Sequence, residues 1–164
     1  MALEASLWAQ DAAHELRPGQ HYERGAMVRD SARAVSFTLP ADWMGRMPVD
    51  SEVLLLSSPT HDGVGLVALL DTMTGERLVE RLSEPQEFGE AVVLQLSKPI
   101  EQVGQQWLAS YLSGHVVGRA TALLGPDAQA VVFFFAGPHA EAKAFERALA
   151  ELAASTQFES IASL

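Results

Sequence analysis

The chain has 164 residues, of which 48% are hydrophobic and 20% are charged, a composition typical of one globular domain with a packed core. Its 21 acidic residues outnumber its 11 lysines and arginines, and a formal net charge of -10 has the wrong sign for gripping nucleic-acid phosphates or anionic lipid. Cysteine is absent, which excludes disulfides, thiolate metal ligands and cysteine nucleophiles, and no apolar run approaches the roughly 18 residues of a membrane span. We therefore expect neither a nucleic-acid partner nor a membrane span.

The first part of the chain is predicted to be an extension, residues 1–21, ahead of a single α+β domain at residues 22–164. Apolar residues at loose helical spacing over Leu3–Leu16 predict a marginal helix, and the Pro18-Gly19 pair ends it. Within it, Ala5–Ala12 resembles the small-residue end of a secretory leader. That likeness favours a periplasmic or secreted location over a cytoplasmic one, although the same residues could simply begin a short helix, so the compartment stays open.

The first clear strand lies before Pro40, because apolar and polar residues alternate over Val35–Leu39. A short strand at Ala26–Val28 precedes it, and Asp30-Ser31 is expected to turn one into the other. Proline cannot donate a ladder hydrogen bond, so this strand ends there. Trp43 is then expected near the end of the sheet.

A second hairpin is predicted from two apolar strands, Val53–Leu56 and Val64–Leu70. Between them, Asp62-Gly63 is the residue pair that a two-residue hairpin turn requires. The two strands are therefore expected to be antiparallel neighbours.

A helix is predicted after this hairpin. Thr72 or Thr74 can cap its N-terminus, and it runs to about Leu82. Leu78 and Val79 complete a narrow apolar stripe with Leu82, which we expect to face the sheet.

The second half is predicted to be an antiparallel meander ending in a helix over Gly137–Ser155. Short connections imply antiparallel neighbours, and Pro138 suits the first turn of the helix. The expected strands are Ala91–Leu96, Gln105–Leu112, Val116–Leu124 and Ala128–Ala136. The fold class is therefore α+β, with an antiparallel sheet of six to eight strands flanked by helices and the C-terminal helix packed on it.

Catalytic and cofactor signatures are not predicted. Gly63–Ala68 matches the G-x-G-x-x-A dinucleotide pattern, but it follows a hairpin turn and enters a strand, where the pattern needs a helix. His61 beside Asp62 is poorly placed for acid/base work on a tight turn. No two of the five histidines have i, i+4 spacing; they are His14, His21, His61, His115 and His139. We expect no catalytic residues, no cofactor and no metal, while ligands brought together in space stay an open alternative.

The stretch S-F-T-L-P-A-D-W at 36–43, the last apolar strand with its amphipathic helix, and the closing S-T-Q-F at 155–158 together resemble the PsbP-like superfamily. That superfamily includes photosystem extrinsic PsbP proteins, Ran-release-factor-type proteins, bacterial DcrB-like lipoproteins and chaperones of type VI secretion effectors. The resemblance covers Tyr22–Phe158 and points to the DcrB-like or effector-chaperone-like bacterial branch. It implies an antiparallel sheet with helices on both faces and a binding or assembly role without catalysis.

The function expected from these features is a non-enzymatic binding or assembly-accessory domain, in the cell envelope, that binds a protein partner. One alternative is a cytoplasmic chaperone of type VI secretion effectors. A second is a hydrolase whose histidine and carboxylate groups meet in space. The sequence names neither the partner nor the oligomeric state.

The expected partner-binding residues are Trp43, Met44 and Met47, on a loop that Pro40 opens and Pro48 closes. Loops run over the surface, and methionine suits irregular apolar contacts. The competing interpretation is that all three cap the core. Changing Met44 and Met47 to Gln separates the two interpretations, because unchanged partner capture with a lowered melting temperature would make these residues part of the core.

Overall fold

The computed structural model describes residues 13–89 and 91–160. Two α-helices lie within this part of the chain, α2 (Gly75–Ser83) and α3 (Ala142–Ser155), and a 3-10 turn, η1 (His139–Glu141), precedes the second. The strands are β1 (His14–Glu15), β2 (His21–Tyr22), β3 (Met27–Asp30), β4 (Val35–Thr38), β5 (Met44–Arg46), β6 (Leu54–Ser57), β7 (Val64–Leu70), β8 (Gln86–Phe88), β9 (Val92–Leu96), β10 (Glu101–Val103), β11 (Gln106–Ser113), β12 (Val116–Leu124), β13 (Ala130–Pro138) and β14 (Gln157–Phe158). The fold is α+β, as predicted.

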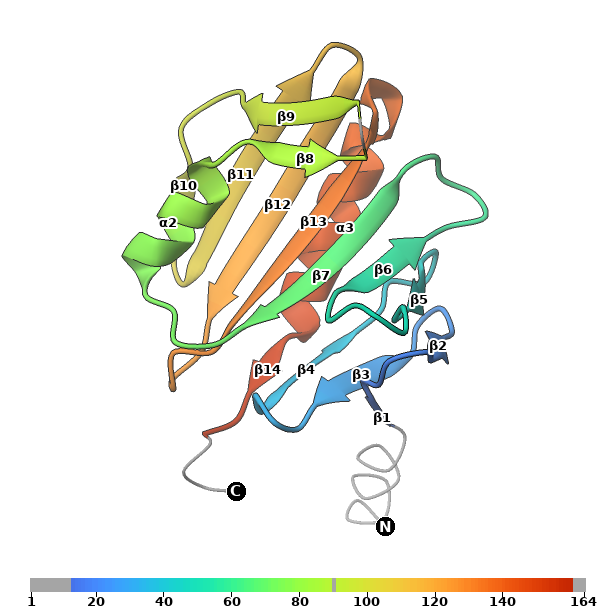
Figure 1. Ribbon diagram of the computed structural model, residues 1–164, viewed down its shortest axis with the longest axis vertical. Helices are drawn as coiled ribbons and strands as arrows, with labels where there is room; N and C mark the ends of the chain where they lie inside the picture. Colours follow the sequence, from blue (N-terminus) through green and yellow to red (C-terminus); the bar gives the residue numbers. More distant parts are fainter. Residues whose placement is uncertain (1–12, 90, 161–164) are drawn as a thin grey trace.

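The strands form a large antiparallel sheet and a small one (Figure 1). The large sheet has ten strands, in the order β2-β5-β6-β7-β13-β12-β11-β9-β8, with β10 also paired to β11. The small sheet has four, in the order β1-β3-β4-β14. The prediction of six to eight strands was too low, because strands of two or three residues are too short to show an alternating pattern.

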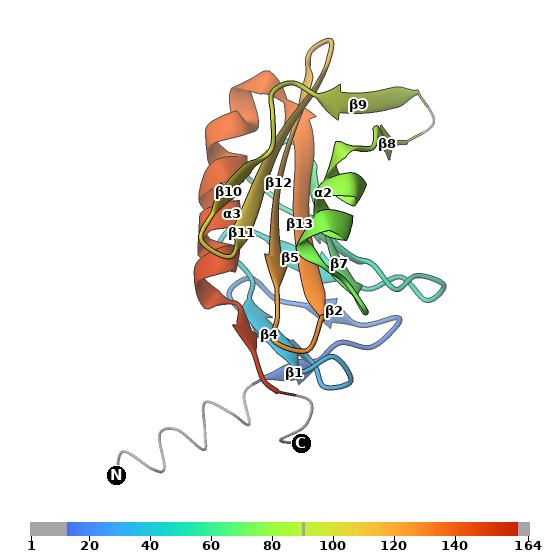
Figure 2. The ribbon, with the colours of Figure 1, turned by 90° about the vertical axis from the view of Figure 1, so that its left-hand side faces the viewer.

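The centre of the molecule is β13, which is buried on both faces, as its apolar sequence predicts. Phe133 and Phe135 belong to the core cluster beneath α3, while Val132 and Phe134 belong to the cluster beneath α2. Figure 2 shows the two helices on opposite faces of the sheet. Each helix therefore closes a core of its own.

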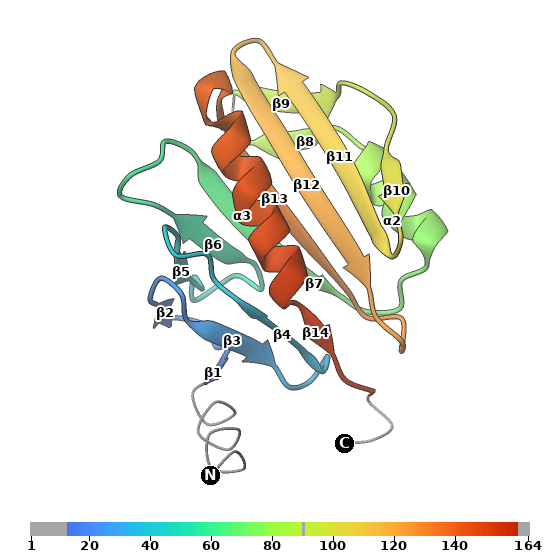
Figure 3. The ribbon, with the colours of Figure 1, turned by 180° about the vertical axis from the view of Figure 1, so that it is seen from behind.

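The C-terminal helix lies across β12 and β13 and also contacts β4 (Figure 3). Phe145, Leu149 and Leu152 are buried, each contributing about 1.5 to 3 kcal/mol of burial free energy. The predicted start at Gly137 was wrong, because β13 continues through Pro138, opposite Val116. Proline is tolerated at that strand end, where a missing N–H matters least.

Helix α2 is capped by Thr74, whose side chain accepts a hydrogen bond from the Arg77 amide at 3.2 Å, so one of the two predicted caps is confirmed. Leu78 and Leu82 are buried, one turn apart on the same side. Val79 is 36% exposed and does not belong to the buried stripe, because each helical residue rotates about 100° from the one before it.

Two further expectations were wrong in detail. The hairpin between β6 and β7 has a longer loop, residues 58–63, because the ladder closes at Leu56 and Gly65. The predicted helix over Leu3–Leu16 lies mostly outside the described residues, but its end is β1, which pairs in parallel with β3. Backbone pairing there overrides a weak helical pattern.

Candidate functional site

Helix α2 covers only part of the face of the large sheet on which it lies. Leu78 and Leu82 of α2 pack with Trp107 and Tyr111 of β11. The Tyr111 hydroxyl donates a 2.5 Å hydrogen bond to the Leu82 carbonyl, and burial raises the pKa of this tyrosine, so it remains a donor at neutral pH. In Figure 1, β7, β6 and β5 continue the sheet away from α2. Helix α2 is therefore held against β11, and it leaves the part of this face formed by β7, β6 and β5 uncovered.

Apolar side chains cover this open part of the sheet. Leu55 of β6 lies opposite Leu66 of β7, and strand alternation puts Val64 on the same face. Met44 of β5 shares that face too, since it pairs with Ser57, two residues from Leu55. We call Met44, Leu55, Val64 and Leu66 the open sheet face.

Exposure distinguishes this face from the core. Met44 is 40% exposed and Val64 is 39% exposed, while Leu55 and Leu66 are half-buried. The opposite side of the same strands carries Leu56 and other fully buried residues. An apolar surface that neighbouring elements leave partly open is where another molecule gains most by burial.

The three residues expected to bind a partner lie in different environments. Trp43 is 2% exposed and meets Phe135 edge-on, with ring centroids 4.7 Å apart. Met47 is also buried. Only Met44 is reachable, and it lies on strand β5 rather than on the predicted loop. Two of the three residues therefore cap the core, and the third belongs to the open sheet face.

His61 lies between two carboxylates contributed by distant segments. Its Nδ1 is 2.9 Å from Glu141 Oε2, and its Nε2 is 3.4 Å from Asp42 Oδ2. Its ring also stacks on Trp43. Sequence spacing indicated no partner for any histidine, because the partners of His61 come from η1 and from the link before β5, where no local spacing could reveal them.

This arrangement is better suited to holding segments together than to chemistry. Both ring nitrogens of His61 face carboxylates, so neither is directed at a hydroxyl nucleophile. The cavity beside the ring has a volume of about 40 Å³, near the size of a single water. In the part of the chain that the structure describes, no three histidine or acidic side chains are grouped to hold a metal ion.

Solved structures show which proteins this arrangement resembles. CyanoP, the cyanobacterial PsbP of Synechocystis sp. PCC 6803, superposes with a TM-score of 0.53 at 12% identity, over 85% of this chain and 92% of that one. This chain therefore shares the fold of CyanoP. A mutant of the protein Mog1 superposes with a TM-score of 0.50 at 11% identity, over 90% and 99% of the two chains. The Ran-binding protein Mog1p of Saccharomyces cerevisiae has a TM-score of 0.47 at 12% identity, over 83% and 96%.

Sequence comparisons give no family: no family model matches the chain, and no curated protein matches it significantly. The described residues also contain no helix long and apolar enough to cross a membrane. The solved structures therefore show the fold alone.

Proposed function

We propose that this chain is a non-enzymatic binding or assembly-accessory domain whose partner is another protein. The open sheet face carries the proposal: it joins Met44 and Val64, each about two-fifths exposed, to half-buried Leu55 and Leu66. Flexible methionine beside branched aliphatic residues suits an apolar partner surface.

The partner's chemistry follows from the surroundings of this face. Its centre is apolar, so a partner gains most by presenting aliphatic or aromatic side chains. The chain's net charge of -10 favours a partner with a basic rim and repels an acidic one. Mog1, with which the chain shares its fold, is named a Ran-binding protein in yeast, and this agrees with a protein partner.

A narrower form of the proposal places the chain in the DcrB-like or effector-chaperone-like branch. A cell-envelope accessory protein and a cytoplasmic chaperone of type VI effectors would both use an apolar face to bind another chain. They differ in compartment and partner. Fractionation of the native host, with the partner identified by mass spectrometry, separates the two.

A hydrolase at His61 is the competing proposal, and it is motivated by the convergence with Asp42 and Glu141. The geometry favours a structural role, because both ring nitrogens are engaged and the adjacent cavity is too small for a substrate. We therefore propose that the protein is not an enzyme.

The test uses full-length protein and a partner recovered from the native host, identified and then purified. Met44→Gln combined with Val64→Gln should weaken the measured affinity about tenfold or more, at an unchanged melting temperature. The matched control combines Val49→Gln and Val103→Gln, which are 75% and 59% exposed but lie off this face.

Two results would contradict the proposal. One is unchanged affinity in the Met44 and Val64 double variant. The other is an equal loss in the control, which would show that any change in surface apolarity matters. Met47→Gln provides an internal comparison, because it should lower the melting temperature by placing an amide in the core.

A further inference from the structure

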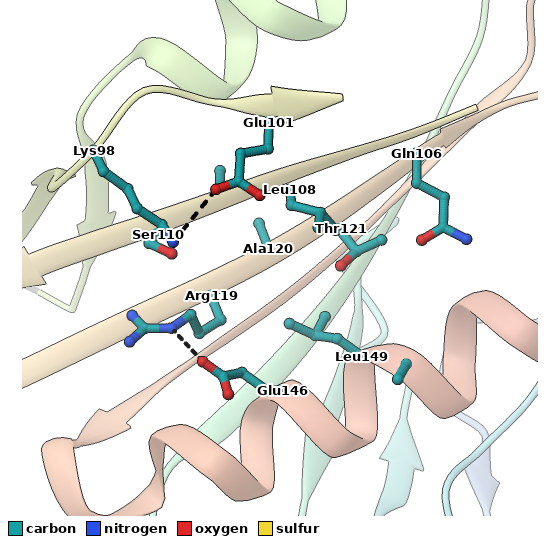
Figure 4. Close-up of a pocket in the computed structure, with 12 residues that line it drawn as sticks. Lys98, Glu101, Gln106, Leu108, Ser110, Arg119, Ala120, Thr121, Glu146 and Leu149 are labelled. Atoms are coloured by element: carbon teal, nitrogen blue, oxygen red, sulfur yellow. Dashed lines mark hydrogen bonds and ion pairs between the residues drawn. The ribbon is translucent and has the colours of Figure 1, made fainter. Parts of the chain in front are cut away.

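A second surface feature lies on the opposite face of the sheet, between α3 and β11. It is a groove with a volume of about 310 Å³ (Figure 4). We call it the α3 groove; its principal lining residues are Glu101, Leu108, Ser110, Arg119, Thr121 and Leu149. Helix α3 packs on β12 and β13, and it leaves the neighbouring strand β11 uncovered on this side.

The floor of the α3 groove is made of two cross-strand pairs. Ser110 lies opposite Arg119, and Leu108 lies opposite Thr121. Side chains of directly opposite residues are in contact distance, about 4.5 to 5.5 Å between Cβ atoms. One pair therefore sets a hydroxyl beside a guanidinium, and the next sets a hydroxyl beside an aliphatic chain.

The hydroxyl of Thr121 makes no side-chain hydrogen bond within the described residues. The residue as a whole is only 3% exposed, but its side chain lines the groove, and its hydroxyl is not among the buried unpaired atoms of the described residues. Leu123, two positions after it, and Val117, four positions before it, lie on the same face, are apolar and pack with the core beneath α3. A hydroxyl that lines a groove and has no partner in the protein is available to hydrogen-bond a ligand that enters it.

The charges of the groove are arranged by depth. The Arg119 side chain is 20% exposed; its Nη1 donates to the Gly118 carbonyl at 2.9 Å and its Nε to Glu146 at 3.3 Å, which leaves Nη2 free to donate. Glu146 is 58% exposed, and so is Glu101, which pairs with Lys98 at 3.7 Å. Figure 4 shows these two ion pairs on opposite sides of the groove. The Arg119 guanidinium therefore lies deep, and the two carboxylates and the Lys98 ammonium lie at the rim.

We infer that the α3 groove binds a small zwitterion with an aliphatic side chain, an α-amino acid or a dipeptide. Its carboxylate accepts hydrogen bonds from Arg119 and from the hydroxyls of Ser110 and Thr121. Its ammonium group lies at the rim, near Glu101, and its aliphatic chain packs on Leu108. The groove volume is at the lower end of ligand-pocket sizes, which suits a ligand of this size.

Calorimetry on the full chain tests the ligand class, with L-leucine and leucyl-alanine as probes. One of these should bind at least about tenfold more tightly than three analogues: 4-methylpentanoate without the amine, 3-methylbutylamine without the carboxylate, and the neutral N-acetyl-leucine amide. No binding heat from either probe at about 10 mM, or equal binding of the neutral analogue, overturns the inference.

Two variants test the residues. Arg119→Gln should weaken probe binding about tenfold or more, while Arg24→Gln, which removes the same charge from an exposed turn, should not. Thr121→Val should weaken binding severalfold and leave the melting temperature nearly unchanged, because the substitution keeps the side-chain shape and the hydroxyl has no partner within the protein. Unchanged probe binding in Thr121→Val and Arg119→Gln overturns the site. Partner affinity at the open sheet face is a separate measurement and does not depend on this result.

Discussion

The imidazole of His61 stacks on the indole of Trp43, with ring centroids 5.9 Å apart and planes 8° apart. Trp43 is itself in contact with Phe145 of α3, at a centroid distance of 6.3 Å. The loop before β7, the corner before β5 and the C-terminal helix therefore meet at one aromatic group. Glu141 adds a polar link from the turn that precedes the helix.

The first prediction separates the two contributions of His61. His61→Phe keeps a ring over Trp43 but removes both nitrogens, and should cost about 1 kcal/mol of unfolding free energy. His61→Ala removes the stacking as well and should cost about 2 kcal/mol. Urea unfolding of both variants measures the difference. Equal losses would show that stacking contributes nothing, and no loss in His61→Phe would show the same for the carboxylate contacts.

The second prediction concerns the docking of α3. Leu152 is fully buried, so Leu152→Ala should cost about 4 kcal/mol, whereas Leu149 borders the α3 groove and Leu149→Ala should cost about 2 kcal/mol. The difference arises because a truncation at an open groove leaves less enclosed cavity. Chemical denaturation at a fixed temperature gives both values. Losses below about 0.5 kcal/mol would mean that α3 is not docked on the sheet as described.

The main strands and both helices could be predicted because each has a periodic pattern long enough to read. The apolar run Val131–Phe135 predicted a central strand covered on both sides, and this is confirmed. Short strands such as β5 and β10 were missed, since three residues give no measurable period and their pairing depends on distant partners.

The candidate sites were predictable only in part. Met44 is exposed, but because β5 alternates Met44 outward and Gly45 inward, and not because a loop carries it; its role in binding stays a prediction. The α3 groove was missed, although Arg119 and Thr121 interrupt one face of an otherwise apolar strand and could have indicated it. The His61 contacts with Asp42 and Glu141 had no sequence signal, because chain folding alone brings these segments together.

The third prediction is a pH dependence at Glu15. Partial burial favours its neutral form, but hydrogen bonds from Ser31 and the nearby Arg29 outweigh this and lower the pKa of the carboxyl below 4.5. A lowered folded-state pKa means that the ionised form stabilises the fold above the unfolded pKa, and this stabilisation is lost as pH falls through the folded pKa.

Glu15→Gln should therefore reduce stability at neutral pH and flatten the acid limb of a plot of unfolding free energy against pH, below about 4.5. Denaturation series at successive pH values provide the measurement. Glu23→Gln is the control, because Glu23 is an exposed glutamate nearby in sequence. If Glu15→Gln leaves the slope of unfolding free energy against pH unaltered in the acid range, the prediction is contradicted.

The fourth prediction concerns the close approach of two glycines beneath Phe145. Gly63 has a φ of 118°, and a Cβ added there would lie 2.7 Å from both the Ala136 carbonyl oxygen and the Phe145 ring. Gly63→Ala should therefore combine backbone strain with overpacking and cost about 3 kcal/mol or more. Gly114→Ala is the matched control, with a φ of 58° and open space around the added Cβ, and should cost about 1 kcal/mol. Gly137 meets Gly63 at the same point, so equal costs in Gly63→Ala and Gly114→Ala would mean that the loop before β7 does not approach β13 and α3 as closely as described.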